Sequence, residues 1–402
     1  MRTGWGRLQA VAISGSAGEG MLLTALPVIA LTITKDPRQV ALVNVVGQLP
    51  WLLFSLLAGV LIDRIRRTAV LASAFAVQAV AAVALGVAAM TGLLSLPLLV
   101  VVSFVVVTAQ VLGDGATGAL VADVVPPDRL PAANARMILI ERGVVQFVVP
   151  PVAGFLLPVA AGLPAWIACC TALLALALTR GIQVAHVPPP PAHPLQDIKE
   201  GLKFLVGSRL LRAITLSVAL GSFAASADRA MLVLYASDVL HVGPGGYGGL
   251  LACLAVGWIV SSLVVGRVVA KLGYAWSMRL ASMANVLWVA LIAVLPPWWA
   301  LIGGVLTMLS STTLVWNVCS QSSRQRFTPT ALLGRVLTSH RTLAWGLTPL
   351  GALAGGLVAA QWGLRSVWVM SATVQLLSLV LVWRAISPAG FAAEEERTAI
   401  PA

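Results

Sequence analysis

Long apolar segments, separated by short polar ones, recur along the whole chain. A helix needs about 20 apolar residues to cross the hydrocarbon core of a membrane, and about twelve stretches reach that length. They run roughly from Leu8 to Ile33, Val40 to Ile62, Thr68 to Met90, Leu96 to Val121, Met137 to Val159, Pro164 to Leu178, Ala213 to Tyr235, Leu250 to Val269, Met278 to Leu295, Trp298 to Cys319, Val336 to Ala359 and Val367 to Val382. The pattern predicts an all-α integral membrane protein with about twelve transmembrane helices.

The first and second halves of this pattern resemble each other. The segment Ser16-Ala17-Gly18-Glu19-Gly20 is similar to Ser226-Ala227-Asp228-Arg229-Ala230, 210 residues later. The spacing of Arg136, Arg142 and Pro150 recurs in Arg335, Arg341 and Pro349. Arginine is rare inside membrane spans, so this second match carries more weight than matches in alanine or leucine. Internal duplication is common among transporters, and it predicts two pseudo-symmetric halves of six helices each.

The predicted division places one half at residues 1–180 and the other at residues 213–385. A cytoplasmic linker over 181–212 joins them, and residues 386–402 form a cytoplasmic tail. Four consecutive prolines stop any helix early in the linker. Charged and apolar residues then alternate in the pattern of an amphipathic helix at the membrane surface, and we interpret the segment as a tether.

Composition narrows the class of protein further. Hydrophobic residues make up 59% of the chain, charged residues only 10%, and soluble domains usually carry about 25% charged residues. The net charge of +12 does not require nucleic acid, because 20 of the 26 lysines and arginines fall on one side of the predicted membrane. Such an excess marks cytoplasmic loops, so we expect both termini in the cytoplasm. The family resemblance described below further implies the inner membrane of a bacterium. The four cysteines have no metal-binding or disulfide spacing.

Residues Gly59-Val60-Leu61-Ile62-Asp63-Arg64-Ile65-Arg66-Arg67 resemble the G-x-x-x-D-R/K-x-G-R-R/K signature of the major facilitator superfamily. A weaker copy stands at Gly266-Arg267-Val268-Val269-Ala270-Lys271-Leu272-Gly273, and further likeness lies in Pro150-Pro151-Val152-Ala153-Gly154 and Pro349-Leu350-Gly351-Ala352. These segments are similar to the branch that contains bacterial drug, macrolide and siderophore exporters. The resemblance implies the major facilitator fold and alternating access. The fourth span departs from many proton-driven exporters because it contains no arginine.

The loop signature predicts a cytoplasmic gate. Gly59 permits close approach of helices, and the resemblance implies that Asp63 accepts hydrogen bonds at the start of span eleven, near Arg335. Arg64 and Arg67 are then expected to pair with Asp123 at the end of span four. The alternative interpretation is ordinary anchoring by positive residues on the cytoplasmic side.

Charged side chains inside predicted spans are the main candidates for chemistry, because each costs roughly 2.5–3.5 kcal/mol at a helix centre. The set is Glu19, Asp114, Glu141, Arg142, Asp228, Arg229 and Arg341. We expect at least one of the acids to contact substrate or carry a proton. The alternative is a set of ion pairs that hold the two halves together.

Two further groups complete the candidate site. Residues that break or narrow helices are expected to serve as bending points, namely Pro150, Pro151, Gly154, Pro349 and Gly351. Polar and aromatic side chains on the spans are expected to line a cavity, namely Asn44, Gln48, Gln146, Trp316 and Asn317. Each of these also fits a helix–helix hydrogen bond or tight packing.

Together these observations predict a secondary active transporter. The family resemblance implies that it exports a small amphipathic organic compound, such as an antibiotic, and we expect exchange for protons. Its expected partners are this small molecule, protons and the lipid bilayer. We expect a monomer with no cofactor, no metal and no catalytic residues. Uptake, transport of a lipid-like substrate, and a sensor built on the same fold remain alternatives.

Overall fold

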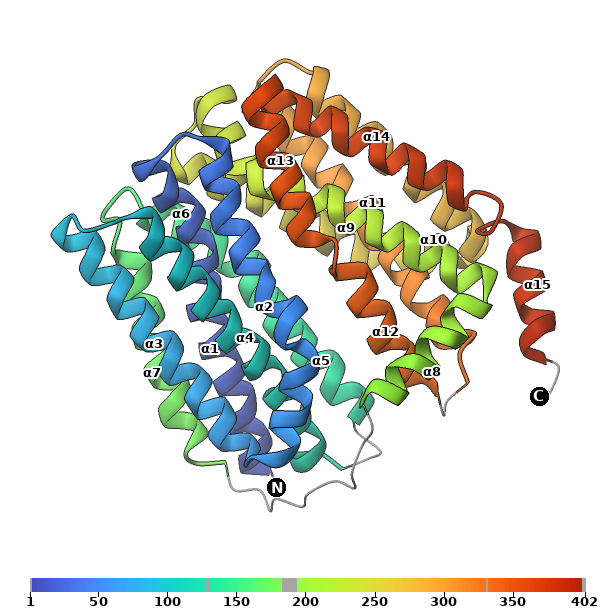
Figure 1. Ribbon diagram of the computed structural model, residues 1–402, viewed down its shortest axis with the longest axis horizontal. Coiled ribbons are helices and arrows are strands. Elements are labelled where there is room, and N and C mark those ends of the chain that lie inside the picture. The colour runs from blue at the N-terminus through green and yellow to red at the C-terminus, as the bar shows by residue number, and fades with distance from the viewer. Residues whose placement is uncertain (1, 127–129, 183–193, 330–331, 400–402) are drawn as a thin grey trace. The chain divides into compact units, whose positions relative to one another are not determined.

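The computed structural model describes residues 2–126, 130–182, 194–329 and 332–399, and Figure 1 shows how they run through helices. Within some helices, including residues 55–64, 142 and 146, only the backbone belongs to this description. The described residues form helices and connecting segments without any strand. The predicted all-α membrane fold is therefore confirmed.

The chain divides into two units. Unit 1 comprises Met1–Ala192 and His241–Ala252, and unit 2 comprises His193–Leu240 and Cys253–Ala402. Unit 1 contains α1 (Arg2–Ile33), α2 (Pro37–Arg64), α3 (Arg67–Thr91), α4 (Leu96–Val124), α5 (Leu130–Gly143), the π-helical turn η2 (Val144–Val148), α6 (Val149–Leu156) and α7 (Leu163–Thr179). Here α1 packs against α7 and α4, while α3 packs against α4 and α7.

Unit 2 repeats this arrangement with added helices at one end. Its elements are α8 (Pro194–Gly207), α9 (Arg209–Leu234), η3 (Tyr235–Val239), most of α10 (Pro244–Val294), α11 (Trp299–Arg326), α12 (Leu333–Trp345), α13 (Thr348–Trp362), α14 (Leu364–Val382) and α15 (Pro388–Ala399). Helix α9 packs against α13 and α14, as α1 packs against α7 in unit 1. The linker helix α8 lies on α12, and α15 contacts α9.

Eight helices of the described residues are long and apolar enough to cross a membrane. One of them, α10, has 51 residues and counts as two spans because Gly273 breaks it with φ 71° and ψ 169°. Only glycine adopts such a conformation without strain. The shorter apolar helix α7, together with α2 and the α5–η2–α6 segment, completes twelve membrane-crossing segments in the described part of the chain.

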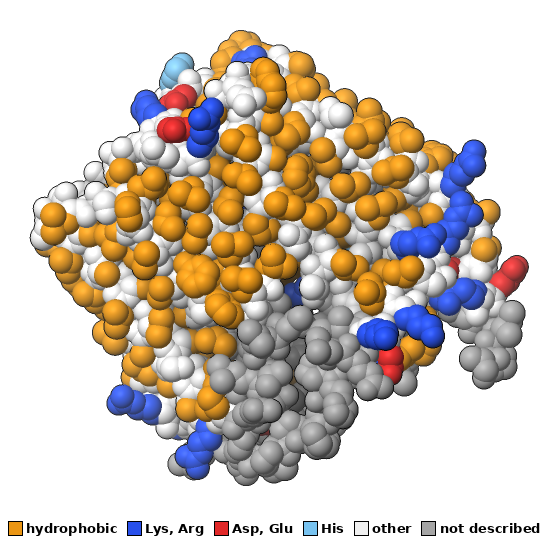
Figure 2. All heavy atoms as spheres, in the orientation of Figure 1, with side chains coloured by type: hydrophobic (Ala, Val, Ile, Leu, Met, Phe, Trp, Pro, Cys, Tyr) orange, Lys and Arg blue, Asp and Glu red, His pale blue; other side chains and the backbone are white. Residues whose placement is uncertain are grey.

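Apolar side chains cover the bodies of these helices on the outside as well. Figure 2 shows them over the middle of the helices, whereas lysines and arginines gather near helix ends. Val80, Leu263 and Val294 each leave at least 70% of their surface exposed. An exposed apolar surface of this extent is typical of contact with lipid.

The same close contact recurs in both units. In unit 1, Gly47 of α2 lies against the hydroxyl of Ser103 on α4, and this hydroxyl donates to the Val43 carbonyl at 3.2 Å. In unit 2, Gly257 of α10 faces serines of α11, and Ser311 donates to its carbonyl at 3.0 Å. Small residues permit such approach between helices, and the serine hydroxyl adds a hydrogen bond across the interface.

Each unit also has its own apolar core. In unit 1, Leu8, Leu71 and Leu120 are fully buried where α1, α3 and α4 meet. In unit 2, Met278 and Trp316 are buried with Phe391 of α15. The ring of Phe391 stacks on Tyr274 and meets Phe327 edge-on, with centroid distances of 6.4 and 5.9 Å. Helix α15 is therefore part of the core of unit 2.

Helix contact in unit 2 depends on Gly351 of α13, because an added Cβ would overlap the backbone carbonyl of Phe223 on α9. We expect Gly351→Ala to lower the free energy of unfolding by about 1–3 kcal/mol, the usual cost of overpacking. Gly304→Ala on α11 is the matched control, because nothing lies within 4 Å of its Cβ position. Titration with sodium dodecyl sulfate, followed by circular dichroism, measures both. Equal stability of the two variants would contradict the assigned contact.

Candidate functional site

Glu19 lies in the middle of α1 and accepts a hydrogen bond from the side-chain amide of Gln110 on α4. The distance from Nε2 of Gln110 to Oε1 of Glu19 is 2.5 Å. Both side chains are half-buried in unit 1. This pair brings a carboxyl group and a neutral amide together inside an otherwise apolar helix bundle.

The sequence around Glu19 explains how its side chain is held there. A Cβ at Gly18 would lie 2.7 Å from the hydroxyl of Thr171 on α7. A Cβ at Gly20 would lie 3.0 Å from the side chain of Val149 at the start of α6. The two glycines therefore let α1 approach a neighbouring helix on either side, and Glu19 extends between these contacts towards α4.

Two other predicted acids lie in the same unit. Asp114 on α4 and Glu141 on α5 are both half-buried, and each interacts with a partner, as Glu19 does. Arg142 and Gln146 belong to α5 and η2, but their side chains lie outside the described residues. The structure thus places Glu19, Asp114 and Glu141 on three elements of one unit. Whether any of them carries a proton stays a prediction.

Asp228 of α9 has a different environment from Glu19. It is 7% exposed and accepts a hydrogen bond of 2.6 Å from the hydroxyl of Ser371 on α14. Ser371 is completely buried and also lies 3.3 Å from the carbonyl of Ala224. Asp228 is therefore enclosed where α9 and α14 pack together, which favours a role in helix association.

The duplication explains this difference. Asp228 corresponds to Gly18 in the repeat, and its partner Ser371 stands on α14, where unit 1 has Thr171 on α7. Both pairs lie where the first helix of a half packs against its last helix. The repeat counterpart of Glu19 is Arg229, whose side chain is exposed. Glu19 and Arg229 thus occupy equivalent positions on the first helix of each half. Asp228, one residue earlier than Arg229, faces the last helix of its half.

The remaining intramembrane arginine, Arg341 of α12, is exposed and lies over the ring of Trp345 at 4.6 Å. Its neighbour His340 is buried, and the ring Nδ1 lies 2.8 Å from the Thr215 hydroxyl on α9. Arg324 at the end of α11 is also buried and donates to Ser320 at 2.5 Å. The sequence analysis missed Arg324 as a buried charge, because it follows the predicted span among other polar residues.

The predicted gate residues lie at helix ends. Arg67 at the start of α3 donates to Asp123 at the end of α4 at 2.5 Å and to the Ala119 carbonyl at 3.2 Å. Both charged side chains are 21% exposed. Gly59, Asp63 and Arg64 belong to α2, and their side chains lie outside the described residues. The role of these residues as a gate stays a prediction.

Arg335 forms an ion pair with Glu200 of the linker helix α8. A Cβ at Gly201 would overlap the backbone carbonyl of Arg335, so α8 and α12 are in direct backbone contact there. This partner of Arg335 was not expected. No local pattern around Glu200 or Arg335 indicates this contact, because the two residues lie 135 positions apart.

The predicted bending points coincide with breaks in the helices. Pro150 and Pro151 open α6 directly after the π-helical turn η2. Helix α12 ends at Trp345, four residues before Pro349, and α13 begins at Thr348. A proline excludes the hydrogen bond to the carbonyl four residues earlier, which accounts for both breaks. Gly154 and Gly351 follow within the new helices and are buried.

The predicted cavity-lining residues divide into several environments. Asn44 donates to the Val40 carbonyl of its own helix at 3.0 Å, and Gln48 also has a partner. Asn317 is exposed. Trp316, by contrast, is 7% exposed in the apolar core of unit 2, a packing position. Among the described residues, no group of three histidine, cysteine or acidic side chains is placed to hold a metal ion.

Comparison with known proteins now adds to this geometry. Residues 8–401 match the family described as "Transmembrane secretion effector". The match covers nearly the whole chain and agrees with the signature segments in the sequence. The protein belongs to the major facilitator superfamily. It is a membrane transporter, and not an enzyme.

The enterobactin exporter EntS of Escherichia coli O1:K1 is 28% identical to this transporter over 161 residues. The aligned region spans 39% of this chain and 37% of the length of that relative. The same values hold for the enterobactin exporter of Shigella boydii serotype 18. The likeness to these curated relatives is thus confined to little more than a third of either chain.

Solved structures resemble the transporter over almost its full length. A bacterial homologue of the iron transporter ferroportin, in an inward-facing state, gives a TM-score of 0.78 at 16% identity, with 95% of this chain and 98% of the other covered. A D-xylose–proton symporter gives a TM-score of 0.71 at 14% identity, with 96% and 97% covered. At this level of identity the likeness concerns the fold alone.

The bond between Asp228 and Ser371 predicts a measurable coupling. Asp228→Ala and Ser371→Ala should each destabilise the transporter, and the double variant should lose less than their sum. The expected coupling is about 0.6 kcal/mol, with an upper bound of about 1.7 kcal/mol for hydrogen bonds between membrane helices. A double-mutant cycle of unfolding in sodium dodecyl sulfate measures it.

Thr373→Ala on the same helix is the control for this cycle. Its exposed hydroxyl donates to the Val369 carbonyl of α14 at 2.9 Å, within its own helix. Combined with Asp228→Ala, it should give additive changes in the free energy of unfolding. Additivity for Ser371→Ala as well would show that the bond to Asp228 contributes nothing to helix association.

Proposed function

We propose that this transporter exports a small amphipathic organic compound in exchange for protons, by alternating access. The description of its family as secretion effectors supports export. The partial similarity to enterobactin exporters supports an organic compound as substrate. The observation that carries the proton-coupled part is the hydrogen bond between Glu19 and Gln110.

An amide partner suits a carboxyl group that gains and loses a proton. The side chain of glutamine offers two N–H donors and one carbonyl acceptor. It donates to a carboxylate oxygen, as Gln110 donates to Oε1 of Glu19, and after rotation of its amide it accepts from a protonated carboxyl group. Glu19 therefore keeps a hydrogen-bonding partner in both states.

The environment of Glu19 also permits the proton to reach it. Its side chain is only half-buried, whereas Asp228 is enclosed between two packed helices. A coupling residue must exchange its proton with water at some stage of the cycle. This requirement favours Glu19 over Asp228, and it leaves Asp114 and Glu141, both half-buried, as further candidates in unit 1.

A substrate with polar and apolar parts fits the amide side chains that stand on an apolar helix. Asn44 and Gln48 provide half-buried amides on α2 of unit 1. These amides stand on a helix that is otherwise apolar. Hydrogen-bonding groups set on an apolar surface recognise compounds of mixed polarity.

We further propose that the ion pair between Arg67 and Asp123 belongs to a gate at the cytoplasmic end of unit 1. The excess of arginine and lysine on one side of the predicted membrane supports this orientation, with both termini in the cytoplasm of a bacterium. Each side chain comes from the last or first turn of a helix, so movement of α3 relative to α4 would break the pair. The protein is expected to work as a monomer.

Proton flux in proteoliposomes tests the function. A trapped pH-sensitive dye should report proton movement when a panel of amphipathic compounds is added to the wild-type protein. Glu19→Gln should abolish this movement, because an amide cannot take up a proton at neutral pH. Absence of flux with every compound would contradict proton antiport.

Asp36→Asn serves as the control for Glu19→Gln. Asp36 is an exposed acid before α2, and its carboxylate accepts from the Arg38 amide at 2.9 Å. The same change from acid to amide at this site should leave flux at the wild-type level. Full flux in Glu19→Gln would remove Glu19 as the carrier and turn attention to Asp114→Asn and Glu141→Gln.

Charge reversal tests the gate. Arg67→Glu and Asp123→Lys should each reduce compound transport several-fold, since each places like charges side by side. The double variant restores an attraction and should recover most of the transport. Transport of a fluorescent compound into inverted vesicles measures all three.

The exposed pair Arg326–Glu395 in unit 2 is the matched control, with an N–O distance of 3.0 Å and side chains that are 53% and 50% exposed. Exposed pairs contribute little to stability. Arg326→Glu should therefore leave transport unchanged. Lack of recovery in the Arg67→Glu/Asp123→Lys double variant, with normal expression, would overturn the gate assignment.

A further inference from the structure

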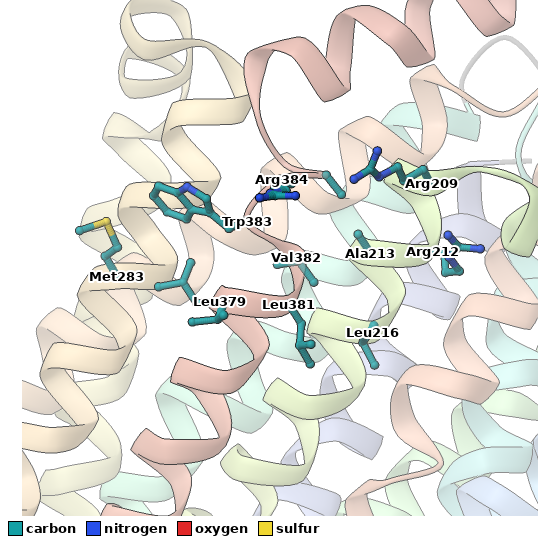
Figure 3. Close-up of a pocket in the computed structure, with 12 residues that line it drawn as sticks. Arg209, Arg212, Ala213, Leu216, Met283, Leu379, Leu381, Val382, Trp383 and Arg384 are labelled. Atoms are coloured by element: carbon teal, nitrogen blue, oxygen red, sulfur yellow. The ribbon is translucent and has the colours of Figure 1, made fainter.

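A cleft of about 610 Å³ lies at one end of unit 2, where α9 begins and α14 ends. Its volume is within the range of pockets that hold small organic ligands, roughly 300–1,000 Å³. The first turns of α9, the last turn of α14, and Met283 of α10 form its walls. Figure 3 shows these side chains around the opening. The cleft is distinct from the hydrogen-bonded acids described above.

Two arginines stand at the mouth of this cleft. Arg209 is the first residue of α9, and Arg384 follows the end of α14. Figure 3 shows Arg209 and Arg384 at the same end of the cleft, with the guanidinium group of Arg209 extended towards the side where Arg384 lies. Both side chains are exposed, and neither forms an ion pair with a carboxylate in the described part of the chain. Two adjacent positive charges without a counter-charge provide a site for an anion.

A third arginine in the cleft has a different role. Arg212 donates to the Val206 carbonyl at 3.2 Å, and in Figure 3 it lies on the far side of α9 from Arg384. It thus contributes positive charge nearby without a direct place at the mouth. The anion site is accordingly assigned to Arg209 and Arg384.

The wall beside the arginines is fixed in place. Arg279 of α10 lies 4.1 Å over the ring of Trp383 and donates to the Trp383 carbonyl at 2.6 Å. Arg279 is buried, and it fixes Trp383 through both the tryptophan ring and the tryptophan backbone. Trp383 in turn lies between the end of α14 and Arg384. Restricting the mobility of Arg384 in this way lowers the entropy that binding would cost.

The rest of the cleft is apolar. Beneath the arginines lie Leu216, Met283 and Leu379, with Leu381 beside them (Figure 3). Leu216, Met283 and Leu381 are 42%, 49% and 66% exposed, so this apolar surface continues onto the outside of the helices. The cleft therefore joins a positive mouth at the helix ends to an apolar wall along the membrane-spanning part.

We propose that this cleft binds an anionic phospholipid, with the phosphate between Arg209 and Arg384 and an acyl chain along Leu216, Met283 and Leu379. Basic pockets between membrane helices bind the head groups of anionic lipids. A free phosphate would use the arginines and leave the apolar wall without a partner. A zwitterionic lipid would use the wall, but the cation beside its phosphate would oppose the arginine charges. Only an anionic lipid satisfies both parts.

Native mass spectrometry of the full-length protein released from detergent tests this proposal. The wild-type protein is titrated with phosphatidylglycerol or phosphatidylcholine of identical acyl chains, and the dissociation constant of the first bound lipid is compared. Each arginine near an anionic lipid contributes about 1 kcal/mol, or about fivefold in affinity. Arg209→Gln/Arg384→Gln should therefore weaken binding of phosphatidylglycerol by about 30-fold and leave phosphatidylcholine unchanged.

Arg267→Gln/Lys271→Gln on α10 is the matched control, because both side chains are exposed and carry the same total charge. It should retain the preference for phosphatidylglycerol. An equal loss of preference in this control would show general attraction to a basic surface and overturn the site. Unchanged preference in the Arg209→Gln/Arg384→Gln variant would do the same.

A second measurement on the wild-type protein remains informative if the double variant does not fold. Soluble glycerol 1-phosphate carries the head group without acyl chains and is added as a competitor. At matched concentrations it should not displace phosphatidylglycerol, because it makes no contact with the apolar wall. Displacement by glycerol 1-phosphate or by inorganic phosphate would identify a simple anion site and refute lipid binding.

Discussion

The hydrocarbon core of a membrane offers no water to a polar group, so each amide, hydroxyl or carboxylate on a spanning helix needs a partner within the protein. This constraint decides where polar residues stand in the chain. Glu19 accepts a hydrogen bond from the amide of Gln110, and Asp228 accepts one from the hydroxyl of Ser371. Asn44 donates to a backbone carbonyl of its own helix. The helix breaks at Pro150 and Pro349 follow the same rule, because a π-helical turn and a new helix start accommodate the lost backbone bonds.

Duplication gave the two halves the same contacts and then let them diverge. Glycine and serine bring α2 close to α4, and the same residue types bring α10 close to α11. Between the first and last helices of each half, Gly18 faces Thr171 in unit 1, while Asp228 bonds to Ser371 in unit 2. One position thus supports close approach by the absence of a side chain, and its counterpart supports association through a hydrogen bond.

The sequence predicts the spans, the halves and the family well, because each rests on long segments or on spaced motifs. It predicts the neighbours of single residues poorly. Membrane helices are apolar on all faces, so the pattern around Asp228 and Arg229 does not reveal which of the two points into the packed interface. Trp316 likewise looks like a cavity residue in sequence and lies in a core. The pairing of Arg335 with Glu200 joins positions 135 residues apart, and no local pattern encodes such contacts.

The position of α15 affects the order in which the two units complete their cores. Phe391 packs against Tyr274 and Phe327, yet it is translated after all of the membrane-spanning helices. Domains form from the N-terminus onward during synthesis. Unit 1 acquires nearly all of its residues early, whereas unit 2 completes its core only when α15 docks. Until α15 docks, Tyr274 and Phe327 lack the aromatic ring that packs against them in the finished protein.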